Sequence, residues 1–117
     1  MQYAAQTQAC IELIESQLND NQVSDRSLNR YFRARRYIGS KDRTAIATQF
    51  YAILRERLIL EYALREVALD VTAVNLVASY LVRSGQPLIT VFTGEQYQPS
   101  RLDGGVVAAL TKIADLD

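Results

Sequence analysis

RYFRARRYIGSKDR, residues 30–43, carries the end of one amphipathic helix and the start of the next. Phe32 lies four residues after Leu28, and this is the spacing of one helix face. Upstream, the helix has two good start residues, Ser24 and Asp25. We therefore predict a helix that starts at one of these two residues and ends near Arg36.

The second half of the same segment predicts a turn and a new helix. Gly39 breaks the apolar pattern, and Ser40 is a favoured N-cap residue. Asp42 would lie in the first turn, where the helix dipole stabilises negative charge. The inward face of this helix is marked by Ile46, Phe50, Ile53 and Leu54.

Residues 40–69 contain neither glycine nor proline, yet one helix of that length would be about 45 Å long. A domain of 117 residues is too small for such a helix. We therefore expect a break near Arg55–Arg57 and a fourth helix beyond it. The apolar residues of that fourth helix are Leu60, Leu64 and Val67.

Further helices are predicted on either side. The first runs from about Gln2 to Leu18, and the polar segment Asn19–Val23 ends it. A fifth helix is expected to be central and most buried, with Asp70 as its cap and with Gly85 and Pro87 after its end. Its wide apolar stripe consists of Val74, Val77, Ala78, Leu81 and Val82.

The region after the fifth helix has two interpretations. Residues 88–93, LITVFT, are rich in β-branched types and could form a strand, but a lone strand has no partner here. A single helical turn that ends at Gly94 fits equally well. The last helix is predicted at about 103–115. The sequence thus predicts an all-α bundle of six or seven helices in one domain, residues 1–117.

Composition excludes several functional classes. The chain has a formal net charge of zero, no histidine and one cysteine. It therefore lacks the commonest general base, an intrachain disulfide and a cysteine-rich zinc site. We expect Cys10 to be an inert core thiol, and we identify no catalytic residue. No apolar run could span a bilayer and no secretory signal is present, so we expect a cytoplasmic protein.

The charge is unevenly distributed. Residues 26–65 hold ten Lys or Arg and three Asp or Glu, a local excess of +7. Such a segment can bind a phosphate backbone locally although the chain as a whole is neutral. We predict RNA binding by shape and backbone contact, aided by backbone N–H groups near Ser40. The predicted contact residues are Arg30, Arg33, Arg35, Arg36, Lys41 and Arg43.

The same residues also have a structural interpretation. The basic segment could be a solvated helix face with a few ion pairs. Asp42 and Arg43 flank a cap, so either could fix the turn rather than contact a ligand. The three aromatic residues of the segment are expected in the core or half-buried, rather than as stacking platforms for bases. These aromatic residues are Tyr31, Phe32 and Tyr37.

RYFRARRYIGSKDR followed by TAIATQFYAILR resembles the N-terminal domain of RsmB-like (Sun/NOP family) RNA methyltransferases. In that family an arginine-rich helix precedes a Gly-Ser-Lys-Asp-Arg turn, here Gly39–Arg43. The next helix of the family ends in a Tyr-x-x-Leu-Arg segment, which is Tyr51–Arg55 in this chain. Residues 91–94, VFTG, with Tyr97 and Pro99 are similar to a Phe-x-Gly and Tyr-x-Pro loop of the same domain.

This resemblance implies a NusB-like all-α fold and a role for the chain as an RNA-binding appendage. It also implies a methyltransferase domain beyond residue 117 that acts on cytosine C5 of ribosomal RNA. The catalytic half of that family needs a Rossmann-like sheet and two cysteines, which this chain lacks. We therefore expect S-adenosylmethionine in that further domain and no cofactor here. The expected partners are ribosomal RNA and the chain's own C-terminal methyltransferase domain.

The resemblance also allows a second function. NusB-like domains also pair with proteins, including themselves, so the resemblance allows a weak dimer. In this alternative the chain is a protein-interaction module. Its basic face would then dock on an acidic surface, either of its own catalytic domain or of another protein.

Overall fold

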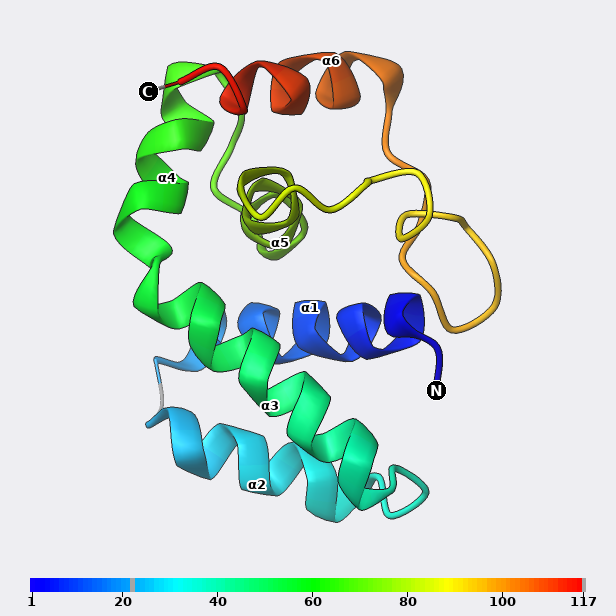
Figure 1. Cartoon of the computed structure of the whole chain (residues 1–117). Helices are drawn as coiled ribbons and strands as arrows, with labels where there is room; N and C mark the ends of the chain where they lie inside the picture. Colours follow the sequence, from blue (N-terminus) through cyan, green and yellow to red (C-terminus); the bar gives the residue numbers. More distant parts are fainter. Residues whose placement is uncertain (22, 117) are drawn as a thin grey trace.

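The computed structural model describes residues 1–21 and 23–116, and all regular structure in them is α-helical. The prediction of six or seven helices is confirmed for these residues. Predictions that include Gln22, in the segment after the first helix, and Asp117, at the end of the predicted domain, lie outside the described residues. The helices are α1 (Tyr3–Asp20), α2 (Ser24–Ala34), α3 (Ser40–Arg55), α4 (Arg57–Glu66), α5 (Ala73–Arg83) and α6 (Gly104–Ile113) (Figure 1).

Helix α5 lies at the centre of the fold, as its wide apolar stripe predicted. It is seen end-on in Figure 1, between α1 and α6, with α4 at its side. Leu76, Val77 and Leu81 are at most 1% exposed, because neighbours cover α5 on several sides. The core therefore gathers around this helix, while α2 packs on the outer side of α1 and completes the lower end of the molecule.

The break predicted near Arg55–Arg57 is confirmed. Helix α3 ends at Arg55 and α4 begins at Arg57, with Glu56 between them at φ −96° and ψ 6°. The bend lets α3 pack on α1 while α4 turns to cover α5 and α6 (Figure 1). Phe50 and Leu60, on either side of the bend, are fully buried. One long helix could not bury both faces in so small a domain.

Two predicted helix caps are wrong. Helix α3 is capped by Gly39, whose carbonyl accepts the first helical hydrogen bond from Arg43 N at 2.9 Å, so Ser40 already lies inside the helix. Helix α5 is capped by Thr72, whose hydroxyl accepts from the backbone N–H of Asn75 at 3.1 Å. Asp70 contributes its carbonyl oxygen, which accepts from the Asn75 side chain at 2.9 Å. Caps depend on backbone angles that residue type alone does not determine.

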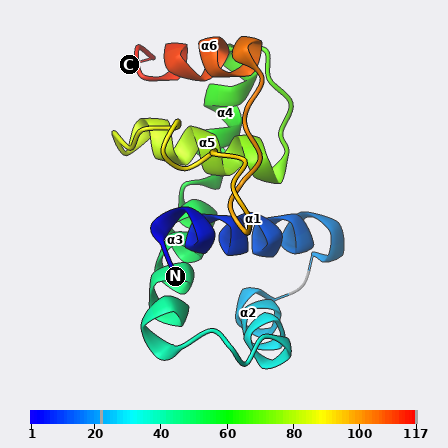
Figure 2. The same cartoon turned by 90° about the vertical axis from the view of Figure 1, so that its right-hand side faces the viewer.

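The segment between α5 and α6 contains no strand, and residues 88–93 adopt the alternative single helical turn. The carbonyl of Leu88 accepts from the backbone N–H groups of Val91 and Phe92, at 3.1 and 2.9 Å. Both of these side chains enter the core. The chain then loops back to the N-terminal end of α1 (Figure 2), where the Gln98 amide donates to Gln2 at 3.2 Å.

Candidate functional site

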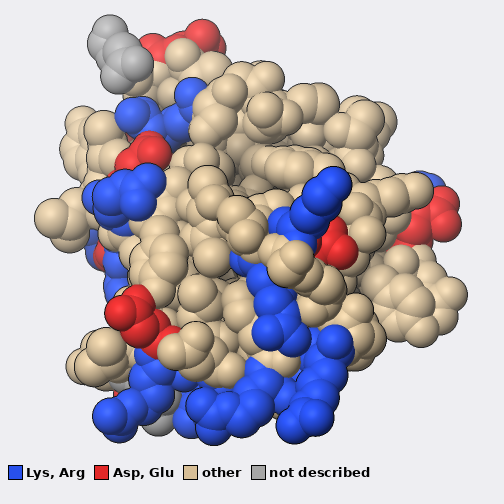
Figure 3. Space-filling view, turned by 60° about the horizontal axis from the view of Figure 1, so that its bottom comes forward, with Lys and Arg blue, Asp and Glu red and all other residues tan. Residues whose placement is uncertain are grey.

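The six predicted contact residues lie at one end of the molecule, on α2, the connection 35–39 and the start of α3. We call this region, residues 24–43, the basic segment from here on. In the space-filling view that brings this end forward, Lys and Arg side chains gather in a band along the lower edge (Figure 3). Helix α2 ends at Ala34, two residues earlier than predicted, because Arg35 leaves the helical region at φ −127° and ψ 67°. Arg36 therefore lies in the connection and not on the helix.

Three of the predicted residues line one open hollow. Arg33, Arg36 and Arg43 surround it together with Asn29 and Phe32, and its volume is about 560 Å³. Arg33 and Arg36 are exposed. Among the described residues, no carboxylate forms an ion pair with any of the three arginines. This hollow thus concentrates positive charge that the described residues leave uncompensated.

Arg43 lines this hollow and also makes two contacts within the fold. Its Nε donates to the carbonyl of Ile38 at 2.7 Å, which closes the turn before α3. Its guanidinium carbon lies 5.4 Å from the centroid of the Phe32 ring, where a cation–π attraction contributes. The turn-fixing interpretation of Arg43 is therefore supported by these contacts. The same side chain also helps to line the hollow.

The other three predicted residues differ in the contacts that they make. Arg35 lies 3.8 Å above the Tyr31 ring, and its Nη2 is 3.9 Å from a carboxylate oxygen of Glu12. Arg30 approaches Asp20 at 3.7 Å, with both side chains about half exposed, so this pair contributes little. Lys41 is exposed. The α1 carboxylates thus partly compensate Arg30 and Arg35.

Asp42 holds α3 against α1. Its carboxylate accepts from the Gln6 amide at 2.9 Å and lies 3.4 Å from the N-terminal ammonium group of Met1. The hydrogen bond from Gln6 lowers the pKa of Asp42, and the hydrogen bond and charge of the N-terminus act in the same direction. These contacts give Asp42 a structural role between α3 and α1, and none of them reaches the turn before α3.

Replacement Asp42→Asn should reduce the acid sensitivity of the fold. A carboxyl whose pKa is lowered on folding contributes stability above its unfolded pKa, ordinarily 3.8, and this stability is lost as the pH falls through the lower folded pKa. Thermal unfolding between pH 5 and pH 2 should therefore depend less on pH in Asp42→Asn than in the unmodified protein. Asp70→Asn, which removes the same charge from an exposed position, is the control. Equal pH dependence in Asp42→Asn and the unmodified protein would contradict this role of Asp42.

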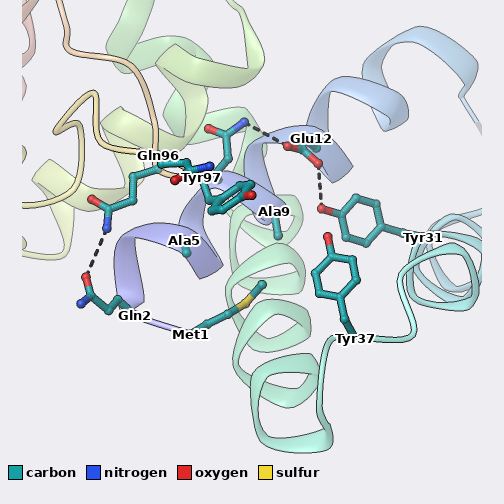
Figure 4. Close-up of a pocket in the computed structure, with 11 residues that line it drawn as sticks. Met1, Gln2, Ala5, Ala9, Glu12, Tyr31, Tyr37, Gln96 and Tyr97 are labelled. Carbon is teal, nitrogen blue, oxygen red and sulfur yellow. Dashed lines mark hydrogen bonds between the residues drawn. The ribbon is translucent and has the colours of Figure 1, made fainter.

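A second hollow, of about 700 Å³, lies beside the basic segment. Its walls come from α1, from Tyr31 and Tyr37 of the basic segment, and from residues 96–98 of the returning loop (Figure 4). The prediction of a core or half-buried position holds for Phe32 and Tyr31 but is wrong for Tyr37, which is 78% exposed. The short helix α2 leaves the 35–39 connection free to direct Tyr37 outward. We call this second hollow the aromatic hollow.

Sequence reasoning did not identify two residues of the aromatic hollow as functional candidates. The carboxylate of Glu12 accepts from Tyr31 at 2.8 Å and from Gln8 at 3.1 Å, and the contact with Tyr31 depends on the packing of α2 on α1. Burial, followed by this bond to Glu12, raises the pKa of Tyr31, so its hydroxyl remains a donor. Tyr97 is 78% exposed on the opposite wall. The Tyr-x-Pro pattern included Tyr97 as part of a family resemblance. The position of Tyr97 beside α1 depends on the tertiary fold.

The described residues contain one cysteine, which is buried, and no cluster of metal-ligating side chains. Cys10 is fully buried, and burial raises the pKa of its thiol, in agreement with an inert core position. No group of three or more Cys, Asp or Glu side chains among these residues could hold a metal ion. In the same part of the chain, no helix has the length and apolar character needed to cross a membrane.

Comparison of the chain with protein-family models, with curated proteins and with solved structures finds no match.

Proposed function

We propose that this chain is an RNA-binding domain that contacts the phosphate backbone through its basic segment. The observation that carries the proposal is the hollow lined by Arg33, Arg36 and Arg43, none of which forms an ion pair with a carboxylate among the described residues. Guanidinium groups bind phosphate oxygens in a bidentate manner, and a cluster of them is unfavourable without an anion. Arg30, Arg35 and Lys41 extend the positive surface on either side.

We further propose a NusB-like fold and a role as the N-terminal appendage of an RsmB-like ribosomal RNA methyltransferase. The support is the resemblance over residues 30–55, together with an all-helical bundle in which the arginine-rich helix α2 is followed by Gly39–Arg43 at the start of α3. In this proposal the chain itself positions RNA and performs no catalysis. S-adenosylmethionine and the cytosine C5 chemistry belong to a further domain, to which this one is attached.

A salt series with a small structured ribosomal RNA fragment tests RNA binding. Each phosphate contact contributes a slope of about −0.7 to −0.9 to a plot of log affinity against log salt concentration. Engagement of the three-arginine hollow alone should give a slope of about −2 to −3, and all six basic residues about −4 to −5. Filter binding or fluorescence anisotropy measures the slope. Absence of binding at low salt would reject the proposal.

A protein-interaction role is the second candidate, and one further surface favours it. Helix α4 exposes Leu58, Ile59 and Tyr62, at 84, 42 and 58%. These residues share one face of α4, and a cluster of large apolar side chains is typical of contact surfaces. In this case the chain would not bind RNA in the salt series. Its basic face would instead dock on an acidic protein surface, or the exposed face of α4 would pack on a second copy of the chain. Sedimentation over a concentration series detects the second copy.

A further inference from the structure

The aromatic hollow is built from parts far apart in sequence. Ala5 and Ala9 of α1 form its floor, with Tyr31 and Tyr37 on one side and Tyr97 on the other (Figure 4). Its volume of about 700 Å³ falls in the range of clefts that hold small ligands, about 300–1,000 Å³. Two of its tyrosines expose 78% of their surface, so their rings are available for stacking.

The ring of Tyr97 is carried on a strained backbone. Tyr97 has φ +65°, in the left-handed region where a bulky residue is strained. The loop around it is held by two backbone bonds, Gly94 N to Pro99 O at 2.9 Å and Gln98 N to Glu95 O at 3.0 Å. Glycine or asparagine would make the same turn at lower cost. Strain of this kind is typical of ligand-contacting positions.

The polar groups of the aromatic hollow suit the edge of a base. Glu12 accepts one bond from Tyr31 and one from Gln8 and lies 3.9 Å from Arg35, and a carboxylate has about four acceptor sites, so acceptor capacity remains. Carboxylates recognise exocyclic amino groups, as in the pairing of Glu with cytosine N4. The side-chain amides of Gln96 and Gln98 at the rim add donors and acceptors.

The aromatic hollow also continues the basic segment. Arg36, which lines the three-arginine hollow, directly precedes Tyr37, which lines the aromatic hollow. Arg35 lies over the Tyr31 ring on the same connection. The connection 35–39 thus contributes an arginine to one hollow and a tyrosine to the other, so a single strand that follows this connection would meet both. Single-stranded nucleic acids are commonly bound by this combination of basic groove and stacking rings.

We propose that the aromatic hollow holds an unpaired nucleobase with an exocyclic amino group, taken from the RNA strand whose phosphates the basic segment binds. The base stacks on Tyr37 and Tyr97, and Glu12 accepts from its amino group. This inference rests on the proposed RNA binding. It adds a requirement for unpaired bases, which phosphate contacts alone do not impose.

A short single-stranded RNA with one 2-aminopurine, a fluorescent base that stacking quenches, is the probe. The unmodified protein should quench it and should bind the same strand more weakly once it is paired in a duplex. Tyr37→Ala and Tyr97→Gly should abolish the quenching and weaken single-strand binding about five- to a hundredfold, the range for one lost base–aromatic stack. Tyr97→Phe, which keeps the ring, should retain both. Tyr62→Ala on α4 is the matched control.

Tyr97→Gly also separates a binding role from a structural one. Glycine relieves the positive φ, so the melting temperature should not fall while the quenching is lost. Cytosine-rich strands should bind more tightly than uracil-rich strands, because uracil lacks the amino group. Equal binding of the two would overturn the role of Glu12.

Three outcomes are distinguishable. If Tyr37→Ala and Tyr97→Gly bind and quench like the unmodified protein, while reversal of Arg33 and Arg36 abolishes binding, the aromatic hollow is not a base site and the proposed function stands. Equal affinity and equal quenching for duplex and single strand would also overturn the inference. If no RNA binds at low salt, the inference and the proposed function both fail.

Discussion

Replacement of both Arg33 and Arg36 by glutamate should weaken RNA binding about a hundredfold at low salt. The two guanidinium groups line the same hollow and have no carboxylate partner in the described residues, so an RNA phosphate is their expected counter-charge. A hydrogen bond to a charged group contributes about 1.5–3 kcal/mol, and two losses at the low end of this range correspond to about two orders of magnitude in affinity. The salt slope should become shallower by about 1.4–1.8.

A matched pair of charge reversals distinguishes a local site from a general charge effect. Arg55→Glu with Lys112→Glu makes the same change in net charge at exposed positions in the last turns of α3 and α6, as Arg33 lies in the last turn of α2. The helix-dipole cost is thus similar for Arg33 and the controls. This control should bind RNA nearly as well as the unmodified protein. Equal losses in both double variants would mean that the basic segment is not a specific site.

Removal of one buried leucine should destabilise the domain far more than removal of an exposed one. Leu81 on α5 is fully buried, whereas Leu58 on α4 is 84% exposed. Leu81→Ala should lower the free energy of unfolding by about 2–5 kcal/mol, because burial is lost and a cavity remains. Leu58→Ala should change it by less than about 0.5 kcal/mol.

Thermal and urea unfolding followed by circular dichroism measure both leucine variants. For a domain of this size each kcal/mol corresponds to about 4 °C, so Leu81→Ala should melt about 8–20 °C lower. A small effect at Leu81 would contradict the central place of α5. A large loss at Leu58 would instead indicate that the exposed face of α4 is covered in solution, and this would favour the protein-interaction role.

Local sequence pattern predicted the helices well, because helical periodicity and breaking residues act within a few positions. The bend near Arg55–Arg57 followed from the length of an unbroken run and the size of the domain. The two wrong caps show the limit of this reasoning. Ser40 and Asp70 are good capping residues, yet Gly39 and Thr72 have the extended backbone that a cap requires. Packing of the flanking segments decided which residue near each helix start adopted this extended backbone.

The sequence identified the six basic candidates, but it did not show which of them lack a carboxylate partner. Arg35 meets Glu12 and Tyr31 only because α2 packs on α1, and Arg30 meets Asp20 for the same reason. Arg33 and Arg36 are exposed and meet no carboxylate among the described residues. A charge count contains no information on such pairing, because the partners belong to another helix.

The sequence by itself determined an all-helical chain with a local excess of +7 in residues 26–65, since helix periodicity and charge are properties of neighbouring residues. Only the tertiary structure decided that Arg33, Arg36 and Arg43 meet in one hollow and that Tyr37 and Tyr97 face each other across another. The physical reason is that the two tyrosines, far apart in the chain, are brought together by burial of Val91 and Phe92 in the common core, which turns the loop back onto α1.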